Sequence, residues 1–346
     1  MAAGWIMNAH KRFEKTGNRS MSFAKVSAII PTYNSAPYVC DAVDSLLAQT
    51  RPLHQIIVVD DGSVDDTRER LLRYGDKITY IWQANAGPPA ARNVGFRQVT
   101  GDFVALLDSD DLWVPEKLAH QMDYFEHHPQ CGLVYSDMKT FDESGIIEHS
   151  VKVSRNLQLP SGYIFPQMFD ETLFQTSAVI MRKACIDHVG DFDIGLRMGD
   201  DYEYFLRVTR HYEAGYVDEP LVMYRQHPNQ GTRTWGKRLH EGLPWEFLVL
   251  RRILDRYPEV FNELGRSRVK LRLAKTYFAL AYACMLEKDH ARARKLLSQA
   301  LHHYPYSAGF LRYYLMTFVS PDLLAKLKTL GDGIRRGDAE IPAGLS

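Results

Sequence analysis

From residue 25 onward, short apolar runs rich in β-branched residues alternate with amphipathic stretches. This alternation is typical of a mostly parallel sheet flanked by helices, so we predict an α/β fold. The predicted strands are 26–30, 55–59, 78–82, 102–107 and 133–136, and the predicted helices between them are 38–49, 65–74, 89–99 and 115–127. Because such a sheet binds ligands at the carboxyl ends of its strands, the polar segments that follow the strands are the first candidates for function.

The pattern changes in the second half of the chain. A polar stretch over 139–173 is expected to be irregular, and it is followed by a predicted strand at 177–182, a helix at 200–212 and a strand at 216–224. From residue 235 the spacing is helical. Eight residues there match the small and large positions of one tetratricopeptide-like hairpin: Tyr277, Leu280, Ala281, Cys284, Ala293, Leu297, Ala300 and Pro305. One repeat is too few for a solenoid, so we expect a helical pair attached to the main domain.

These patterns divide the chain into three predicted parts. Residues 1–21 have no signal-peptide pattern and are predicted to be a flexible tail, 22–234 form the α/β domain, and 235–346 form a helical region. No stretch approaches the roughly 18 apolar residues that a membrane span needs.

Charge and cysteine content narrow the class of protein. The chain has 346 residues with 42 basic and 42 acidic side chains, and this neutrality argues against nucleic-acid binding, which needs a basic excess. The balance is uneven, since 1–250 carry a net charge of −8 and 251–346 a net charge of +8. Four widely spaced cysteines fit neither a zinc cluster nor a disulfide framework, so we predict a reduced, cytoplasmic protein.

The segment LLDSDD, at 106–111, follows an apolar strand and concentrates carboxylates at its end. Asp108 and Asp110 are two residues apart, so an extended backbone points them the same way, as a hard divalent ion with bound phosphates requires. This arrangement suggests Mg²⁺ or Mn²⁺. The alternative is that Asp110 or Asp111 caps the helix that begins near Pro115.

Two further acidic pairs have similar alternative interpretations. In VVDDGS, at 58–63, Asp61 could accept a hydrogen bond from the N–H of a nucleotide base, or the segment could be a turn with Gly62 in the left-handed conformation and a helix cap at Asp65 or Asp66. At 200–201, a carboxylate at a helix start is normally a cap. Asp201 would also suit a general base, because helical spacing places it on the face of Phe205 and Val208.

The order of the motifs resembles that of family 2 glycosyltransferases of the bacterial surface-polysaccharide type. The matching segments, which together span roughly 200 residues, are VSAIIPTYN at 26–34, QIIVVDDGSVDDT at 55–67, NAGPPAARNVG at 85–95, GDFVALLDSDDLWVPEKL at 101–118, GDDYEYFLRV at 199–208 and YRQH at 224–227. The resemblance implies a GT-A fold, which is a Rossmann-like mostly parallel sheet flanked by helices, here with an α-helical C-terminal extension.

The resemblance also implies roles for individual residues. The residues expected to bind the donor nucleotide are Pro31, Thr32, Tyr33, Asn34, Asp61, Arg92, Asp108 and Ser109. Asp110 would bind the metal, and His227 stands where some relatives supply another metal ligand. Asp201 takes the position of the catalytic base in inverting members. The residue before that base is usually Glu, and here it is Asp200.

The activity implied by the resemblance is an inverting, Mn²⁺- or Mg²⁺-dependent glycosyl transfer (EC 2.4) in polysaccharide biosynthesis. The donor would be a nucleoside-diphosphate sugar, expected to be a UDP-sugar. The acceptor would be a hydroxyl of a glycan or lipid-linked molecule. A sugar-nucleotide pyrophosphorylase is the rival enzyme, but it would need a Gly-rich, Arg-containing loop where this chain has PTYN. A nucleotide-binding helical adaptor is the rival outside enzymes.

The basic C-terminal helices have two interpretations of their own. They could contact an anionic membrane surface through Lys270, Arg272, Lys275, Arg292, Arg294, Lys295, Lys326 and Lys328, or they could be a solvated face that balances the acidic domain.

Overall fold

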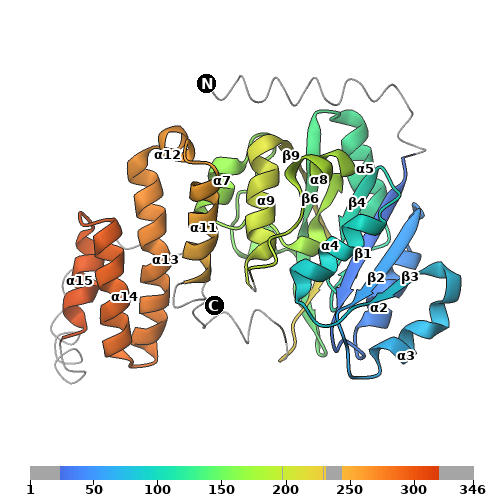
Figure 1. The fold of residues 1–346 in the computed structure, drawn as a ribbon, viewed down its shortest axis with the longest axis horizontal. Helices are drawn as coiled ribbons and strands as arrows, with labels where there is room; N and C mark the ends of the chain where they lie inside the picture. Colours follow the sequence, from blue (N-terminus) through green and yellow to red (C-terminus); the bar gives the residue numbers. More distant parts are fainter. Residues whose placement is uncertain (1–23, 197, 229, 231–243, 319–346) are drawn as a thin grey trace. The chain divides into compact units, whose positions relative to one another are not determined.

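A computed structural model describes residues 24–318, except 197, 229 and 231–243. The chain divides into two compact units between residues 230 and 231. The first unit contains the sheet and the second consists of helices (Figure 1). The predicted tail at 1–21, together with Lys326 and Lys328, lies outside the described residues.

In the described residues, nine strands form one sheet in the order β3-β2-β1-β4-β8-β6-β9-β5, with β7 paired to β6. Their bounds are β1 Val26–Thr32, β2 Gln55–Asp60, β3 Thr79–Trp82, β4 Phe103–Leu106, β5 Leu112–Trp113, β6 Cys131–Asp142, β7 Gly145–Glu148, β8 Ile180–Arg182 and β9 Glu213–Arg225. Strands β3, β2, β1 and β4 are mutually parallel, as their pattern predicted. Beyond them β8 runs antiparallel to both β4 and β6, while β6 and β9 are parallel.

Helices cover both faces of the sheet, which explains why β1 is buried along its whole length. Ala28 and Ile30 of β1 belong to the core cluster that includes side chains of α2 and α5, whereas Ile29 lies against Gly95 of α4 on the opposite face. The helices of this unit are α2 Val39–Leu47, α3 Thr67–Leu71, α4 Pro88–Gln98, α5 Lys117–His127, α6 Val151–Ser154, α7 Phe165–Asp170, α8 Lys183–Val189 and α9 Asp200–His211. The predicted α/β class is confirmed.

About half of the stretch predicted to be irregular, 139–173, lies in helices and strands. Strand β6 continues to Asp142, and β7, α6 and α7 follow it. The prediction was wrong because β6 pairs with β9 along its length, so a distant strand satisfies the backbone of a polar segment. At 177–182 the strand is shorter than predicted, because the 3-10 turn Thr176–Ala178 precedes β8.

The second unit contains α11 Trp245–Arg256, α12 Val260–Glu263, α13 Arg266–Leu286, α14 His290–His303 and α15 Ala308–Met316. Six of the eight predicted hairpin positions are buried in α13 and α14, namely Tyr277, Ala281, Cys284, Ala293, Leu297 and Ala300. The carboxylate of Asp289 accepts a hydrogen bond from the Arg292 backbone N–H and thereby caps α14.

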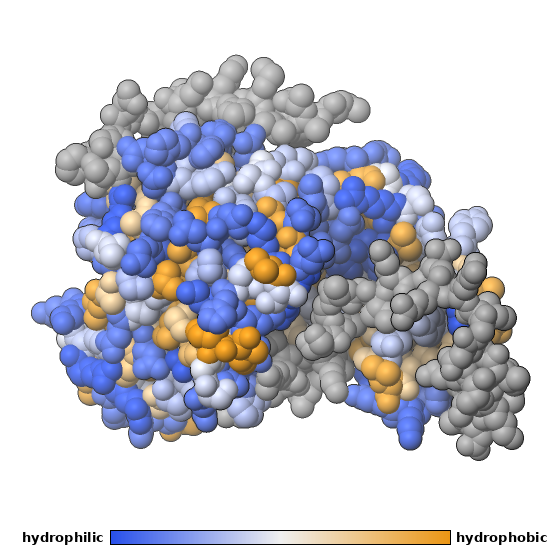
Figure 2. Space-filling view, turned by 180° about the vertical axis from the view of Figure 1, so that it is seen from behind, coloured by the Kyte–Doolittle hydropathy of each residue, from blue (hydrophilic) through white to orange (hydrophobic). Residues whose placement is uncertain are grey.

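On the face shown in Figure 2 the described residues are predominantly hydrophilic, with hydrophobic side chains in small groups. None of the helices in the described part of the chain is both long enough and apolar enough to cross a membrane.

We predict that Gly95→Ala destabilises the first unit, although Ala favours an α-helix by about 1 kcal/mol over Gly. A Cβ at position 95 would lie 2.5 Å from Cγ2 of Ile29, which is fully buried, so the strand or the helix must shift. Overpacking of this kind costs about 1–3 kcal/mol. Urea denaturation of the variant measures the loss.

The control is the double variant Ile29→Ala/Gly95→Ala, in which the clashing side chain is absent. Its loss of stability should be smaller than that of the two single variants added together. A Gly95→Ala variant as stable as the wild type would refute the close packing of α4 on β1.

Candidate functional site

The acidic turn after β4 is built around a buried carboxylate. Asp111 is almost fully buried, and it accepts hydrogen bonds from Ser177 Oγ at 2.6 Å and from the Arg225 backbone N–H at 3.1 Å. Burial, with a smaller effect of Asp110, raises the pKa of Asp111 well above its usual range. The alternative that Asp110 or Asp111 caps the next helix is wrong, because α5 begins only at Lys117 and no side chain caps it.

Asp110 contacts His227, which lies just after the end of β9. Asp110 Oδ2 lies 2.9 Å from His227 Nε2, and the His227 ring packs on Tyr38 with its centroid 4.5 Å away. Arg225 Nε donates to the Asp110 carbonyl at 2.8 Å, so the end of β9 is tied to the turn. The structure therefore brings together the two residues predicted to bind the metal.

The donor set of this pair fits a divalent cation. Carboxylate oxygens suit Mg²⁺ and Mn²⁺, and the Asp110 carboxylate lies within hydrogen-bond distance of the His227 ring, at 2.9 Å. No three His, Cys, Asp or Glu side chains converge as a metal-binding group within the described ranges. A site of two protein ligands leaves positions for water and phosphate oxygens, as Mg²⁺ and Mn²⁺ sites on diphosphates require.

Arg92 of α4 joins the acidic turn to the start of α9. Its buried guanidinium donates from Nη2 to Asp108 Oδ1 at 2.9 Å and from Nη1 to Asp200 Oδ2 at 2.6 Å. Burial acts to lower the pKa of Arg92, but Asp200 and then Asp108 outweigh it and hold the pKa above its usual value. A guanidinium that remains charged at this position keeps two carboxylates from different elements side by side.

Asp200 and Asp201 are adjacent at the start of α9 but lie in different environments. Asp200 is buried against Arg92, and burial raises the pKa of Asp200 to about 7. Asp201 is partly exposed; its Oδ2 accepts from Thr176 Oγ1 at 3.0 Å and its Oδ1 from the Tyr202 backbone N–H at 2.8 Å. The predicted stripe is correct, since Phe205 and Val208 are both buried.

The segments after β1 and β2 are tied together by hydrogen bonds. Asn34 is in the left-handed conformation. Its backbone N–H donates to Ser63 Oγ at 2.9 Å, and its side-chain Oδ1 accepts from the Val64 N–H at 2.9 Å. Gly62 has a φ of 80°, as its turn predicted. A helix cap at Asp66 does not form, whereas Asp65 accepts from the Thr67 N–H at the start of α3.

Asp61 is buried and already accepts three hydrogen bonds. Gln83 Nε2 at 2.6 Å, the Ala86 N–H at 2.9 Å and the Gly87 N–H at 2.8 Å all donate to its carboxylate. A carboxylate has about four acceptor positions, so one is left for a ligand. Asp61 therefore holds the loop before α4, and its contact with a base stays a prediction.

The remaining predicted residues lie at the same edge of the sheet. Pro31 and Thr32 end β1, and Tyr33 beside them is about half exposed. The hydroxyl of Thr32 is buried and has no hydrogen-bond partner in the described part of the chain. Ser109 joins this segment to the acidic turn, because its Oγ lies 2.8 Å from Ser35 Oγ.

Three residues that hold this site together are not among the site residues predicted from the sequence. Arg225 lies within YRQH, so the motif itself could have suggested it. Thr176 and Ser177 belong to none of the motifs, and only the fold brings them to Asp201 and Asp111.

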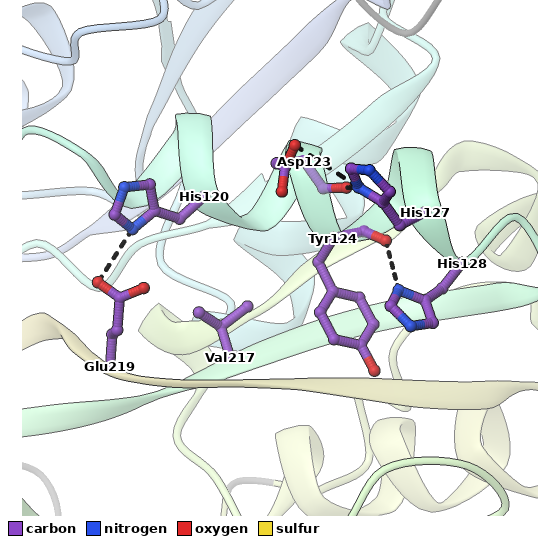
Figure 3. A pocket seen from close by; sticks show the side chains of 7 residues that line it. All are labelled: His120, Asp123, Tyr124, His127, His128, Val217 and Glu219. Atoms are coloured by element: carbon purple, nitrogen blue, oxygen red, sulfur yellow. Dashed lines mark hydrogen bonds and ion pairs between the residues drawn. The ribbon is translucent and has the colours of Figure 1, made fainter.

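A separate hollow of about 460 Å³ lies between α5 and β9 (Figure 3). It is lined by His120, Asp123, Tyr124, His127, His128, Val217 and Glu219. Its histidines bind neighbours in the protein: His120 lies 3.0 Å from Glu219, and His128 stacks on Tyr124. None of the residues predicted to bind donor or metal lines it.

Comparisons with known proteins identify the family. The family model described as "Glycosyl transferase family 2" matches residues 27–189. An uncharacterized glycosyltransferase of Rickettsia typhi is 32% identical over 219 residues, which cover 62% of this chain and 68% of that protein. The chain belongs to glycosyltransferase family 2. The family predicted from the motifs is thus confirmed.

Two other similarities bear on this family 2 glycosyltransferase. The putative teichuronic acid biosynthesis glycosyltransferase TuaG of Bacillus subtilis is 40% identical over 124 residues, 35% of this chain and 49% of that protein. The crystal structure of S. aureus TarS 1-349 in complex with UDP-GlcNAc aligns with a TM-score of 0.59 at 22% identity, over 81% of each chain. At this identity the TarS likeness shows the fold, and the predicted fold class is confirmed.

We predict that Asp200→Asn changes how stability depends on pH. An Asp in the unfolded chain ionises near pH 3.8, whereas Asp200 in the folded glycosyltransferase has a pKa of about 7. Between these values the folded state holds a proton that the unfolded state lacks, so the contribution of Asp200 to stability falls as the pH rises.

Asparagine does not titrate, so the substitution should cost less stability at pH 8 than at pH 5. Urea denaturation of the wild type and of Asp200→Asn at both pH values measures this cost. Because the other titrating groups are the same in the two proteins, their contributions cancel. An equal cost at both pH values would contradict the raised pKa of Asp200.

Proposed function

We propose that the protein transfers a sugar from a nucleoside-diphosphate sugar, with inversion at the anomeric carbon, to a hydroxyl of a glycan or lipid-linked acceptor. The observation that carries the proposal is the Arg92 bridge, since it sets the acidic turn of Asp108 and Asp110 beside Asp201. In an inverting transfer, the acidic turn would bind the donor and Asp201 would remove the proton, on opposite sides of the anomeric carbon.

Asp110 and His227 would hold the divalent ion, either Mn²⁺ or Mg²⁺. When bound, such an ion stabilises the negative charge that develops on the leaving diphosphate. The buried Thr32, Asp61 and Ser109 would hold the nucleotide, together with Pro31, Tyr33, Asn34, Arg92 and Asp108. A UDP-sugar is the proposed donor, and the complex of TarS with UDP-GlcNAc supports this choice.

Asp201 would take the proton from the acceptor hydroxyl as its oxygen attacks the anomeric carbon. Of the two neighbouring acids it is the more exposed, and its carboxylate is not paired with Arg92. Asp200 would keep Arg92 in place. A direct displacement needs no covalent intermediate, so the product has the inverted configuration.

The wider role is proposed to be polysaccharide biosynthesis. The similarity to TuaG, a putative teichuronic acid biosynthesis glycosyltransferase, supports it. We propose 22–234 as the catalytic domain and 235–346 as a helical region with one tetratricopeptide-like hairpin. The adaptor and pyrophosphorylase alternatives are less favoured, because Asp201 and PTYN occupy the positions that a transferase needs.

The test is nucleotide release from a panel of UDP-, GDP- and dTDP-sugars with Mn²⁺, using the wild type, Asp110→Asn and Asp201→Asn. We expect slow hydrolysis of one donor and a loss of at least about 100-fold in either variant, as befits a group that acts in the transition state. Removal of Mn²⁺ by a chelator should have a similar effect.

The matched control is Asp123→Asn, an exposed carboxylate of α5 outside this site, which should retain the wild-type rate. Activity that survives in Asp201→Asn would refute the assignment of the base. If no donor is hydrolysed, even with acceptor-containing membrane extract, the adaptor alternative is favoured.

We also propose that the protein acts as a peripheral protein on the inner face of the cell membrane, through basic residues of α13 and α14. Arg272 and Arg294 are engaged inside the helical unit, with Glu246 and Thr317 respectively. The exposed Lys270, Lys275 and Lys295 would then carry the contact with anionic lipid.

Sedimentation with phosphatidylserine vesicles tests the membrane contact. Replacing Lys270, Lys275 and Lys295 together by Glu should reduce the bound fraction severalfold, because each basic residue near the surface contributes about 1 kcal/mol. Lys77→Glu in the α/β unit is the control. Equal sedimentation of the triple variant and the wild type would rule out this surface.

A further inference from the structure

The 3-10 turn Thr176–Ala178 lies where the two acidic parts of the site meet. It precedes β8, which pairs with β4 and β6. The side chains of Thr176 and Ser177 are buried, with exposures of 2% and 0%. Buried hydroxyls are normally kept for the hydrogen bonds that they make, so the partners of these two indicate their purpose.

Thr176 binds the proposed base. Its hydroxyl donates to Oδ2 of Asp201 at 3.0 Å, while the backbone N–H of Tyr202 donates to Oδ1 at 2.8 Å. One donor on each oxygen fixes the rotation of the carboxylate about its last bond. The lone pairs that remain on Asp201 then have a defined direction.

Ser177 binds the acidic turn instead. Its Oγ donates to Asp111 Oδ2 at 2.6 Å and accepts from the Asp108 backbone N–H at 3.1 Å. These two bonds hold both ends of the four-residue turn that carries Asp110. Neighbouring residues of one turn thus contact separate parts of the site.

The backbone of the turn is itself held by buried side chains. Trp113 Nε1 donates to the Ser177 carbonyl at 2.9 Å, and Gln121 Nε2 donates to the Ala178 carbonyl at 2.8 Å. Lys117 is fully buried, donates to Gln121 Oε1 at 2.5 Å and lies over the Trp113 ring at 3.9 Å. This support keeps the positions of the two hydroxyls fixed.

We propose that Thr176 and Ser177 are positioning residues with different roles, Thr176 for the base Asp201 and Ser177 for the metal and diphosphate site. The inference rests on the proposed function, because it assumes that Asp201 is the base and Asp110 a metal ligand. It follows that substitutions at adjacent positions affect different kinetic constants.

The first experiment compares Thr176→Val with Thr176→Ser in hydrolysis of the donor identified by the panel. Valine keeps the shape and removes the hydroxyl, so we expect kcat to fall about 10- to 100-fold, the effect of losing a hydrogen bond to a charged group. The KM for the donor should stay within about twofold, since donor contacts are unchanged. Serine keeps the hydroxyl and should restore most of kcat.

The second experiment measures binding of UDP with Mn²⁺ by calorimetry, which needs no turnover. Ser177→Ala should weaken binding about 10-fold or more, because the turn loses both bonds. Thr176→Val should bind like the wild type. If Thr176→Val does not fold, Thr176→Ala replaces it in both experiments, with thermal denaturation as the check.

The outcomes separate this inference from the proposed function. If Asp201→Asn is inactive but Thr176→Val has the wild-type kcat, the role of Thr176 is refuted and the function stands. If Thr176→Ser is as impaired as Thr176→Val, the loss of kcat comes from altered packing, and the role of the Thr176 hydroxyl is also refuted. Unchanged UDP affinity in Ser177→Ala would refute the role of Ser177, whereas an active Asp201→Asn would refute the proposed base.

Discussion

The buried guanidinium of Arg92, held between Asp108 and Asp200, is the interaction on which the site depends. A buried charge is costly unless it is paired, and removing one partner leaves the other uncompensated. The pairing therefore requires the end of β4, the helix α4 and the start of α9 to reach the same point. The fold of the α/β unit achieves this by placing α4 directly on β1, where Gly95 permits close contact.

The same network makes two neighbouring acids different. Asp200 faces Arg92 in a buried position and has a raised pKa, while Asp201 is more exposed and binds Thr176. Two carboxylates that are adjacent in sequence but lie in different environments can take separate roles. In this site Asp200 pairs with the Arg92 guanidinium, whereas Asp201, which we propose as the base, pairs with Thr176.

Much of the fold and many of the site residues could be predicted because they depend on local patterns. Strands β1, β2 and β4 were predictable from buried apolar runs and β3 from its β-branched and aromatic residues, and parallel strands bring their carboxyl ends to one edge. PTYN, DDGS and DSDD lie at the carboxyl ends of β1, β2 and β4, so their proximity required no knowledge of distant contacts. The polar stretch at 139–173 was mispredicted because its strand is stabilised by β9, about 80 residues away in sequence.

The sequence by itself determined the family, the α/β class and the residue types at the ends of β1, β2 and β4. Only the tertiary structure decided which acid is buried, which residue pairs with Arg92, and that Thr176 and Ser177 reach Asp201 and Asp111. The reason is physical: a strand's pattern depends on neighbours one or two residues away, whereas burial and hydrogen bonding depend on chain segments that meet only after folding.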